Sequence, residues 1–272
     1  MQTHRARKRF GQNFLCDGNV IDAIIAAAEL NSNDNVLEIG PGQGALTLKM
    51  LPLAGRVDVI EIDRDLARPF ADLDNSRLHL HTGDALKLDW EKILVAGAEY
   101  KLVANLPYNI SSQVLFKMIQ HRDRFSRMVL MFQKEVADRL RAVAGSRDYG
   151  ALTILSQLWF AVSSVVVVPP TAFRPPPKVT SEVLCFTRRR QPLVAIADEA
   201  FFRRVVKGAF AQRRKTLRNC LLSAGFSVAV LETAATDAAI DLKRRGETLT
   251  IEEFASLAAA LQQAISTENE PD

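Results

Sequence analysis

The chain has 272 residues, 48% hydrophobic and 24% charged, which is typical of a globular protein and argues against a disordered or membrane-embedded one. Its net charge of +4 and its isoelectric point near 9.0 suit an acidic partner such as nucleic acid. Three widely separated cysteines, Cys16, Cys185 and Cys220, argue against a disulfide framework or a cysteine-based metal site. No apolar run is long enough to span a membrane. We therefore expect a cytoplasmic protein with no bound metal and no membrane partner.

Basic residues gather in two places along the sequence. One is an N-terminal arm that includes Arg5, Lys8 and Arg9. The other lies within residues 199–218, which hold seven basic residues and one acidic residue, whereas residues 246–272 hold six acidic residues and no basic one. A solvated surface would explain either cluster, but both also suit contacts with phosphates.

The first half of the chain alternates helical and strand patterns. Apolar residues at helical spacing predict a helix over 18–30, and a short buried strand over 36–39 leads into a glycine-rich turn at 40–44. Further strands are predicted over 57–60, 78–81, 102–104 and 127–132. This alternation predicts an α/β fold with a mostly parallel sheet.

Four residues of ligand-binding type recur at the spacing of one strand–helix unit. Gly40, Glu61, Asp84 and Asn105 lie 21, 23 and 21 residues apart, and each follows or ends a predicted strand. Because the carboxyl ends of parallel strands share one edge of a sheet, we expect the four to meet there. Glu61 can accept hydrogen bonds from both hydroxyls of a ribose, and Asp84 can accept one from an adenine amine. This predicts a site for an adenosine-bearing cofactor, although the glycine turn alone also suits an NAD-dependent oxidoreductase.

The segment from Asn105 to Tyr108 supplies what an exocyclic amine on a base requires. The Asn105 side chain and the Leu106 backbone each have a carbonyl that can accept a hydrogen bond, and Pro107 favours an extended Leu106. Tyr108 offers a flat face on which a base can stack. An ordinary turn after a strand can contain the same residues. However, two acceptors beside a stacking surface suit the amine of adenine or cytosine.

A proline-rich loop follows in the second half of the chain. Residues 169–178 contain five prolines around Phe173, between β-branched strands predicted over 162–168 and 182–187. The loop is short and contains no helix, so these two strands must be antiparallel. A stiff loop of this kind could hold Phe173 opposite Tyr108 as the second face of a base-binding sandwich. The alternative is a plain connection between two strands.

Beyond a basic linker near residue 190 the sequence is helical throughout. Helices are predicted over 199–211, 213–223, 227–239 and 250–265. We therefore expect an α/β domain over residues 1–190, including the basic arm, and a helical domain over residues 191–272.

Taken together, these stretches closely resemble the ribosomal RNA adenine N6-dimethyltransferases of the small-subunit (KsgA) type. The matching motifs are KRFGQNFL (8–15), LEIGPGQGALT (37–47), EIDRDL (61–66), GDAL (83–86), NLPYNIS (105–111), VPPTAFRPPPKVTSEV (168–183) and AFAQRRKTLRN (209–219). They follow the family's order over nearly the whole chain. GQNFL and NLPYNIS are the specific motifs, whereas the glycine turn is not.

The resemblance implies that residues 1–190 form a Rossmann-like catalytic domain, which binds S-adenosylmethionine and has a seven-stranded sheet with an antiparallel last strand. It implies that residues 191–272 form a small all-α domain that binds RNA or the ribosome. It implies a cofactor site, with S-adenosylhomocysteine as the product, lined by Asn13, Leu15, Gly40, Gly42, Glu61, Ile62, Asp84, Ala85 and Asn105. The target adenine would be held by Asn105, Leu106, Pro107, Tyr108 and Phe173. The candidate RNA-binding residues are Arg5, Lys8, Arg9, Arg213, Arg214, Lys215 and Arg218.

The implied activity is dimethylation of the N6 amines of two adjacent adenosines in a hairpin loop near the 3′ end of small-subunit (16S) rRNA, during small-subunit biogenesis. The implied partner is this rRNA, in the small ribosomal subunit or its assembly intermediate, and we expect a monomer. Three alternatives use parts of the same pattern. They are a large-subunit rRNA methyltransferase of the antibiotic-resistance type, a DNA amino-methyltransferase and a non-enzymatic RNA-binding assembly factor.

Overall fold

The computed structural model describes residues 12–268, so the predicted contacts of Arg5, Lys8 and Arg9 lie outside the described residues. The chain divides into two compact units. The first contains the chain up to Ala137 together with Ala161–Arg188, and the second contains Asp138–Phe160 together with the chain from Arg189. Residues 138–160, which we had placed in the N-terminal domain, thus group with the C-terminal helices. The backbone N–H of Gly145 donates to the carbonyl of Glu247 (2.7 Å), within that second unit.

Seven strands form the main sheet, in the order β4-β3-β2-β5-β6-β9-β7. Their bounds are β2 Asn35–Ile39, β3 Arg56–Glu61, β4 Leu78–Thr82, β5 Tyr100–Asn105, β6 Phe125–Gln133, β7 Phe160–Val168 and β9 Ser181–Arg188. Strand β2 pairs in parallel with β3 and β5, β3 with β4, and β5 with β6, whereas β9 runs antiparallel to β6. The predicted Rossmann-like sheet with an antiparallel last strand is confirmed.

The strand order reverses between β2 and β5. The chain builds β3 and β4 on one side of β2 and then returns to add β5 and β6 on the other side. With right-handed crossovers, such a reversal places the connecting helices on both faces of the sheet. At such a reversal the loops after neighbouring parallel strands diverge and leave a crevice outside the carboxyl ends of the strands. These ends are Ile39 in β2 and Asn105 in β5, so the fold brings the glycine turn and the Asn105 segment to the crevice.

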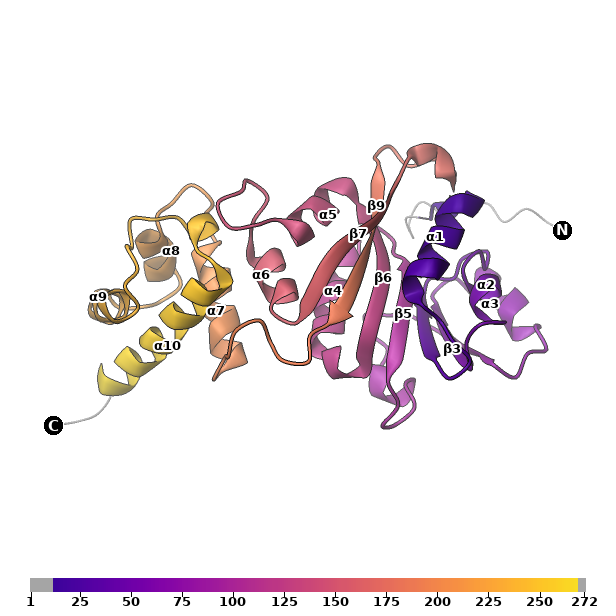
Figure 1. Ribbon diagram of the computed structural model, residues 1–272, viewed down its shortest axis with the longest axis horizontal. Coiled ribbons are helices and arrows are strands. Elements are labelled where there is room, and N and C mark those ends of the chain that lie inside the picture. The colour runs from indigo at the N-terminus through magenta and orange to yellow at the C-terminus, as the bar shows by residue number, and fades with distance from the viewer. Residues whose placement is uncertain (1–11, 269–272) are drawn as a thin grey trace. The chain divides into compact units, whose positions relative to one another are not determined.

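The helices of the first unit flank the sheet, and Figure 1 shows α1 and α4 on opposite faces. Their bounds are α1 Gly18–Ala28, α2 Thr47–Met50, α3 Arg64–Ala71 and α4 Ser111–Gln120, and α5 Lys134–Arg141 spans the boundary between the units. Helix α1 begins because the Asp17 side chain accepts hydrogen bonds from the first free backbone N–H groups. Alternate strand residues such as Val57, Val59, Val129 and Met131 belong to the same buried core as α1.

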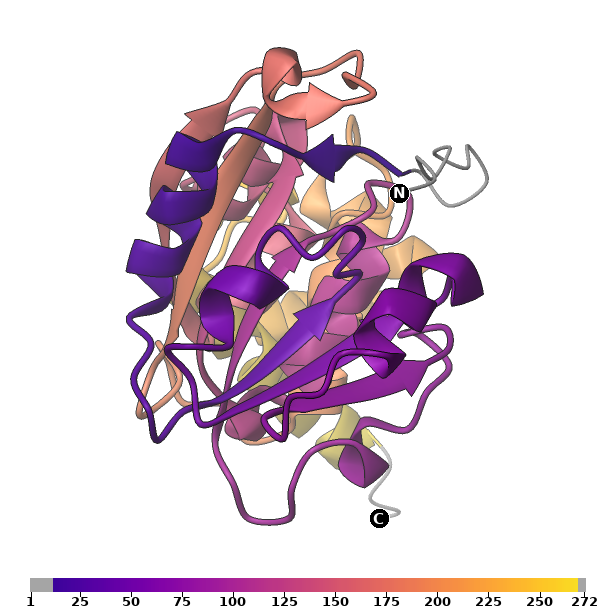
Figure 2. The same cartoon turned by 90° about the vertical axis from the view of Figure 1, so that its right-hand side faces the viewer.

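A two-stranded sheet joins the N-terminal segment to the proline-rich loop. Strand β1 (Phe14–Leu15) pairs antiparallel with β8 (Phe173–Arg174), and the backbone N–H of Cys16 donates to the carbonyl of Ala172 (2.8 Å). Figure 2 shows the indigo β1 segment running beside this loop. The pairing was not predicted, and it holds residues 14–15 against a segment about 160 positions away in the sequence.

The second unit is helical, as expected for the C-terminal part of the chain. Its helices are α6 Ala151–Gln157, α7 Glu199–Ala209, α8 Leu217–Ser223, α9 Val228–Asp237 and α10 Ile251–Glu268. One helix boundary differs from the prediction. Arg213, Arg214 and Lys215 lie in the turn before α8, because Thr216 caps the helix by accepting from the backbone N–H of Asn219. No helix within residues 12–268 is long and apolar enough to cross a membrane.

Candidate active site

A pocket opens at the crevice between the carboxyl ends of β2 and β5. Each predicted strand-end residue, Gly40, Glu61, Asp84 and Asn105, lines it. The remaining residues that the resemblance implied for the cofactor line it too: Asn13, Leu15, Gly42, Ile62 and Ala85. The residues that spacing and the resemblance assigned to the cofactor therefore line one pocket.

The glycine turn approaches the pocket closely and is held by Glu61. Gly40 and Gly42 have φ angles of 70° and 58°, a region that side chains disfavour. A Cβ on Gly42 would lie 3.1 Å from the Phe14 ring. The Glu61 carboxylate, only 4% exposed, accepts hydrogen bonds from the backbone N–H groups of Gly42 (3.2 Å) and Asp63 (2.8 Å). Burial raises the pKa of Glu61, although these two N–H groups oppose the shift.

A second buried carboxyl, Glu38 at the end of β2, also lines the pocket. It is 1% exposed and accepts a hydrogen bond of 2.5 Å from the hydroxyl of Thr47. Burial raises the pKa of Glu38 to about 8, the Thr47 hydrogen bond lowers it, and the nearby charge of Glu61 raises it. Two carboxyl groups in one pocket make it a suitable environment for a positively charged ligand.

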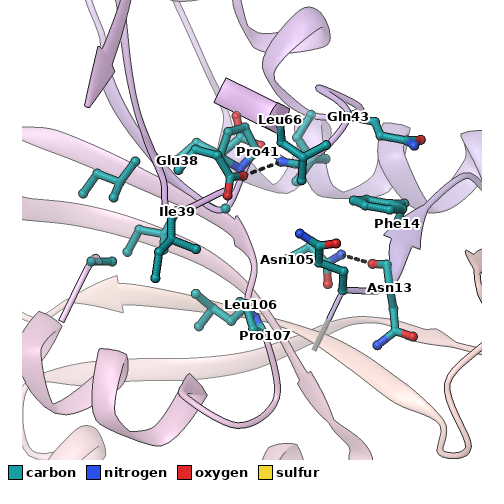
Figure 3. A pocket seen from close by; sticks show the side chains of 18 of the residues that line it. Asn13, Phe14, Glu38, Ile39, Pro41, Gln43, Leu66, Asn105, Leu106 and Pro107 are labelled. Atoms are coloured by element: carbon teal, nitrogen blue, oxygen red, sulfur yellow. Dashed lines mark hydrogen bonds between the residues drawn. The ribbon is translucent and has the colours of Figure 1, made fainter. Parts of the chain in front are cut away.

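The N-terminal segment fixes the orientation of Asn105, and Figure 3 shows Asn105 and Asn13 facing each other beside the pocket. The Asn105 side-chain nitrogen donates to the backbone carbonyl of Asn13 at 3.2 Å. The side-chain oxygen of Asn105 is therefore the atom left to accept from a ligand. Gln12 ties the same segment to Asp63 through a hydrogen bond of 3.1 Å.

The other residues of the Asn105–Tyr108 segment also line the pocket. Leu106, Pro107 and Tyr108 all line it, and the Leu106 side chain is buried. The Tyr108 hydroxyl lies 2.6 Å from the hydroxyl of Ser181, the first residue of β9. Burial raises the pKa of Tyr108, so the ring remains a neutral phenol that is anchored at its far end.

Phe173 does not lie where the sandwich hypothesis required. It does not line the pocket and is only 2% exposed, because the pairing of β1 with β8 places it opposite Leu15 in the hydrophobic core. In this structure Tyr108 lines the pocket. Phe173 instead pairs with Leu15 of the N-terminal segment.

Comparison with known proteins identifies the family. A model of the ribosomal RNA adenine dimethylase family matches residues 3–263. The chain belongs to this family. It is 58% identical over 259 residues to a ribosomal RNA small subunit methyltransferase A from Syntrophotalea carbinolica, covering 95% of this chain and 98% of the relative. A protein of the same name from Pseudomonas aeruginosa is 44% identical, with 96% of each chain covered.

Two solved structures show the same fold. A dimethyladenosine transferase from Plasmodium falciparum superposes with a TM-score of 0.76 at 29% identity, covering 92% of this chain and 98% of that one. The 23S rRNA methyltransferase ErmE superposes with a TM-score of 0.69 at 26% identity, covering 92% and 100%. As a ribosomal RNA adenine dimethylase, the chain is an enzyme that transfers methyl groups from S-adenosylmethionine to adenines of rRNA.

A group of basic side chains lies in the second unit of this adenine dimethylase. Arg147, Arg213, Arg214 and Arg245 line a shallow depression together with Glu247. Arg213 also donates to the backbone carbonyl of Arg147. Of the predicted RNA-binding residues, Lys215 is exposed and Arg218 pairs with Glu232 at 2.8 Å, and neither lines the depression. Arg147 and Arg245 were not predicted, because they lie far from the 199–218 cluster in the sequence.

Several other residues of the site were not identified from the sequence. Glu38 and Thr47 lie within the LEIGPGQGALT motif, where an acidic residue directly before the end of a buried strand could have drawn attention to them. The sequence around Ser181 and Lys117 gives no such indication. Ser181 contacts a residue 73 positions away, and Lys117 contacts residues about 30 positions away. Among residues 12–268, no three histidine, cysteine or acidic side chains gather as metal ligands do.

Proposed function

We propose that the enzyme dimethylates the N6 amines of two adjacent adenosines in a hairpin loop near the 3′ end of small-subunit rRNA. The observation that carries the proposal is the arrangement of the Asn105 segment beside a pocket that suits S-adenosylmethionine. Full-length relatives named small subunit methyltransferase A support the choice of subunit. We also propose a monomer that acts in the cytoplasm, on the small subunit or its assembly intermediate.

The residues of the pocket fit the groups of the cofactor. Glu61 can accept from the ribose hydroxyls, Asp84 can accept from the adenine amine, and the close turn at Gly40 and Gly42 leaves room for the backbone to approach. When bound, S-adenosylmethionine supplies an electrophilic methyl group on a positively charged sulfur. A positive charge nearby would favour the ionised forms of Glu38 and Glu61, whose pKa values burial raises.

The target amine is oriented by two acceptors that the fold holds in place. The Asn105 side-chain nitrogen donates to the Asn13 carbonyl, which leaves the Asn105 oxygen facing the ligand. This oxygen and the Leu106 carbonyl are the acceptors available to the two N–H groups of the amine. These hydrogen bonds favour a pyramidal nitrogen and aim its lone pair at the methyl group. The residues therefore accelerate the reaction by positioning and electrostatics, not by removing a proton first.

Tyr108 provides the surface against which the target base stacks. A base must leave its own stack to enter the pocket, at a cost of a few kcal/mol that is lower in an unpaired loop. The hydrogen bond to Ser181 keeps the Tyr108 ring in one orientation before the base arrives. In this proposal Phe173 acts indirectly, because it pairs with Leu15 in the N-terminal segment whose Asn13 carbonyl accepts from Asn105.

Arginines of the second unit supply the contacts with RNA phosphates. Arg213, Arg214, Arg147 and Arg245 surround one depression, and Lys215 and Arg218 lie in or just after the same turn. Contacts of this kind provide affinity without reading sequence. The N-terminal residues Arg5, Lys8 and Arg9 would add to them.

A large-subunit target remains the second candidate, because the ErmE fold is also similar at 26% identity. The higher identity to small-subunit enzymes, 58% for the Syntrophotalea protein, favours the small subunit. The decisive experiment is methyl transfer from labelled S-adenosylmethionine to unmodified small subunits, large subunits and naked small-subunit rRNA, with mapping of the labelled nucleotides. We expect two adjacent labelled adenosines in the small subunit. Label confined to large-subunit RNA would overturn the proposal.

A further inference from the structure

Lys117 in α4 reaches across to the loop that borders the cofactor pocket. Its ammonium group donates to three backbone carbonyls, those of Ala85 (2.9 Å), Leu86 (3.2 Å) and Leu88 (2.5 Å). An ammonium has three N–H groups, so all of its donors are directed at one short segment. The Lys117 side chain thereby acts on this loop as a bound cation would.

Trp90 completes the contact from the other side. Its indole N–H donates to the Ala85 carbonyl at 3.0 Å, and its ring centroid lies 5.0 Å from the Lys117 ammonium. The Trp90 side chain is fully buried. A cation over an aromatic ring gains further electrostatic stabilisation, so the position of the ammonium is well defined.

The loop that Lys117 holds carries three residues of the pocket, Gly83, Asp84 and Ala85. One carboxylate oxygen of Asp84 accepts from the backbone N–H of Leu86 (2.9 Å), and the Asp84 carbonyl accepts from the N–H of Leu88 (2.9 Å). The backbone N–H groups of the turn therefore donate to Asp84 within the turn itself, whereas three of its carbonyls accept from Lys117. Without the ammonium the three carbonyls would lose the donor that they share, although the Trp90 indole would still donate to the Ala85 carbonyl, and the turn would relax.

The charge of Lys117 lies among these carbonyl dipoles and near two carboxylates. Burial lowers the pKa of Lys117, and the nearby carboxylates of Asp84 and Asp89 oppose that shift. Helix α4 begins at Ser111, directly after the Asn105 segment. One helix thus connects the target-amine site at its start with the cofactor loop at Lys117.

We propose that Lys117 is a positioning residue for cofactor recognition, because it fixes the 83–88 loop so that the free carboxylate oxygen of Asp84 meets the 6-amino group of an adenine. The inference rests on the proposed cofactor site. A rigid acceptor accepts an amine and rejects a ring that carries a carbonyl in the same place. A mobile acceptor discriminates less well.

The test compares two ligands by calorimetry, S-adenosylhomocysteine and its hypoxanthine analogue S-inosylhomocysteine, in which a carbonyl replaces the 6-amino group. We expect the wild-type enzyme to prefer the adenine ligand. Lys117→Met keeps the length of the side chain but has no donors. It should weaken binding of the adenine ligand by about 5- to 10-fold, as for the loss of one well-made hydrogen bond, and reduce the preference by a similar factor.

Lys101→Met is the matched control. Lys101 also donates to a backbone carbonyl, that of Glu29 (2.5 Å), pairs with Asp34 (2.9 Å), and has a side chain 15% exposed. It lies at the amino end of β5, opposite the end that carries Asn105. This variant should keep the wild-type preference even if it lowers stability. If Lys117→Met does not fold, Lys117→Gln replaces it, since a glutamine can satisfy at most two of the three carbonyls.

Three outcomes would overturn the inference. Wild-type affinity and preference in Lys117→Met would show that the loop does not depend on the ammonium. An equal loss of affinity for both ligands would show that Lys117 contributes only to the stability of the site and not to recognition of the amine. A wild-type enzyme without any preference, with Asp84→Ala also unchanged, would overturn the Asp84 contact of the proposed function together with this inference. Loss of preference in Asp84→Ala alone would leave the proposed function intact and contradict only the role of Lys117.

Discussion

The pocket of the first unit and the arginine depression of the second unit hold their polar groups in opposite ways. Glu38 and Glu61 are 1% and 4% exposed, and each accepts hydrogen bonds from the protein itself. Arg213 and Arg214 are exposed on a turn. Fixed, buried groups determine geometry and chemistry, whereas exposed cations provide long-range and salt-sensitive affinity. Changes in the two regions should therefore be separable, one affecting catalysis and the other affecting RNA binding.

The largest effect should come from Asn105→Ala. It removes a held acceptor from the target amine, and by analogy with the loss of one preorganised polar group the rate should fall by about 10²- to 10³-fold. Affinity for small subunits, measured by filter binding, should not change. Asn109→Ala is the control, since Asn109 is an exposed asparagine in the same segment that does not line the pocket. Equal rate losses in both variants would mean that the segment acts only as a turn.

Glu61→Gln should weaken binding of S-adenosylmethionine. The substitution keeps the size of the side chain but removes the charge that the ribose hydroxyls would meet, and hydrogen bonds to charged groups contribute about 1.5–3 kcal/mol. We expect an affinity loss of about 10- to 100-fold by calorimetry. Glu99→Gln, at an exposed acid of the same unit that pairs with Arg188, should have no effect. Unchanged affinity in Glu61→Gln would remove Glu61 from the cofactor site.

Glu38→Gln tests the buried carboxyl group through pH. Its pKa is raised from 4.5 to about 8, so the folded protein keeps a proton that the unfolded chain releases between these values. The free energy of unfolding should therefore fall as pH rises through this window, by about 1.4 kcal/mol per pH unit. In urea titrations at pH 5 to 8 without ligand, the free energy of unfolding of Glu38→Gln minus that of wild type should grow with pH. A difference that stays constant would contradict the raised pKa.

Neutralising Arg213 and Arg214 should flatten the salt dependence of RNA binding. Each lost phosphate contact reduces the slope of log affinity against log salt by about 0.7–0.9. Affinity for S-adenosylmethionine should stay the same. Arg203→Ala is the control within the same unit, because Arg203 pairs with Glu199 along α7. A slope like that of wild type in the double variant would make the depression an ordinary solvated surface.

The smallest effect concerns the anchor of Tyr108. Ser181→Ala and Tyr108→Phe each remove one side of the same hydrogen bond, so each should lower kcat/KM by about 3- to 10-fold. The double variant should be no worse than either single variant, because the interaction is already lost. Effects that add in the double variant would show that the hydrogen bond does not orient the ring.

The sequence predicted the site where the information is local. Gly40, Glu61, Asp84 and Asn105 each end or follow a strand, and parallel strands bring such ends together, so their spacing was enough to place them around one pocket. The sheet and its antiparallel last strand followed from the same patterns and from the resemblance. Pairing between distant segments leaves no such periodicity.

The differences from the prediction share this cause. Neither segment alone contains a pattern that predicts the pairing of β1 with β8. This pairing buries Phe173, which we had expected to face Tyr108. The contacts of Lys117 and Ser181 are also long-range and depend on side-chain packing. The start of α8 is a local exception, since the three basic residues before it were placed inside a helix because the capping role of Thr216 was not recognised.

The central claim is that the Asn105 oxygen and the Leu106 carbonyl orient the amine for two successive methyl transfers. A monomethylated amine has one N–H left, so it can satisfy only one of the two acceptors, and the two transfers should depend differently on Asn105. The direct test is single-turnover methylation of unmodified small subunits by wild type and Asn105→Ala, with mono- and dimethyladenosine separated by mass spectrometry. We expect both transfers to slow in Asn105→Ala, with a changed ratio of their rates. Two transfers at the wild-type rates in Asn105→Ala would contradict the account.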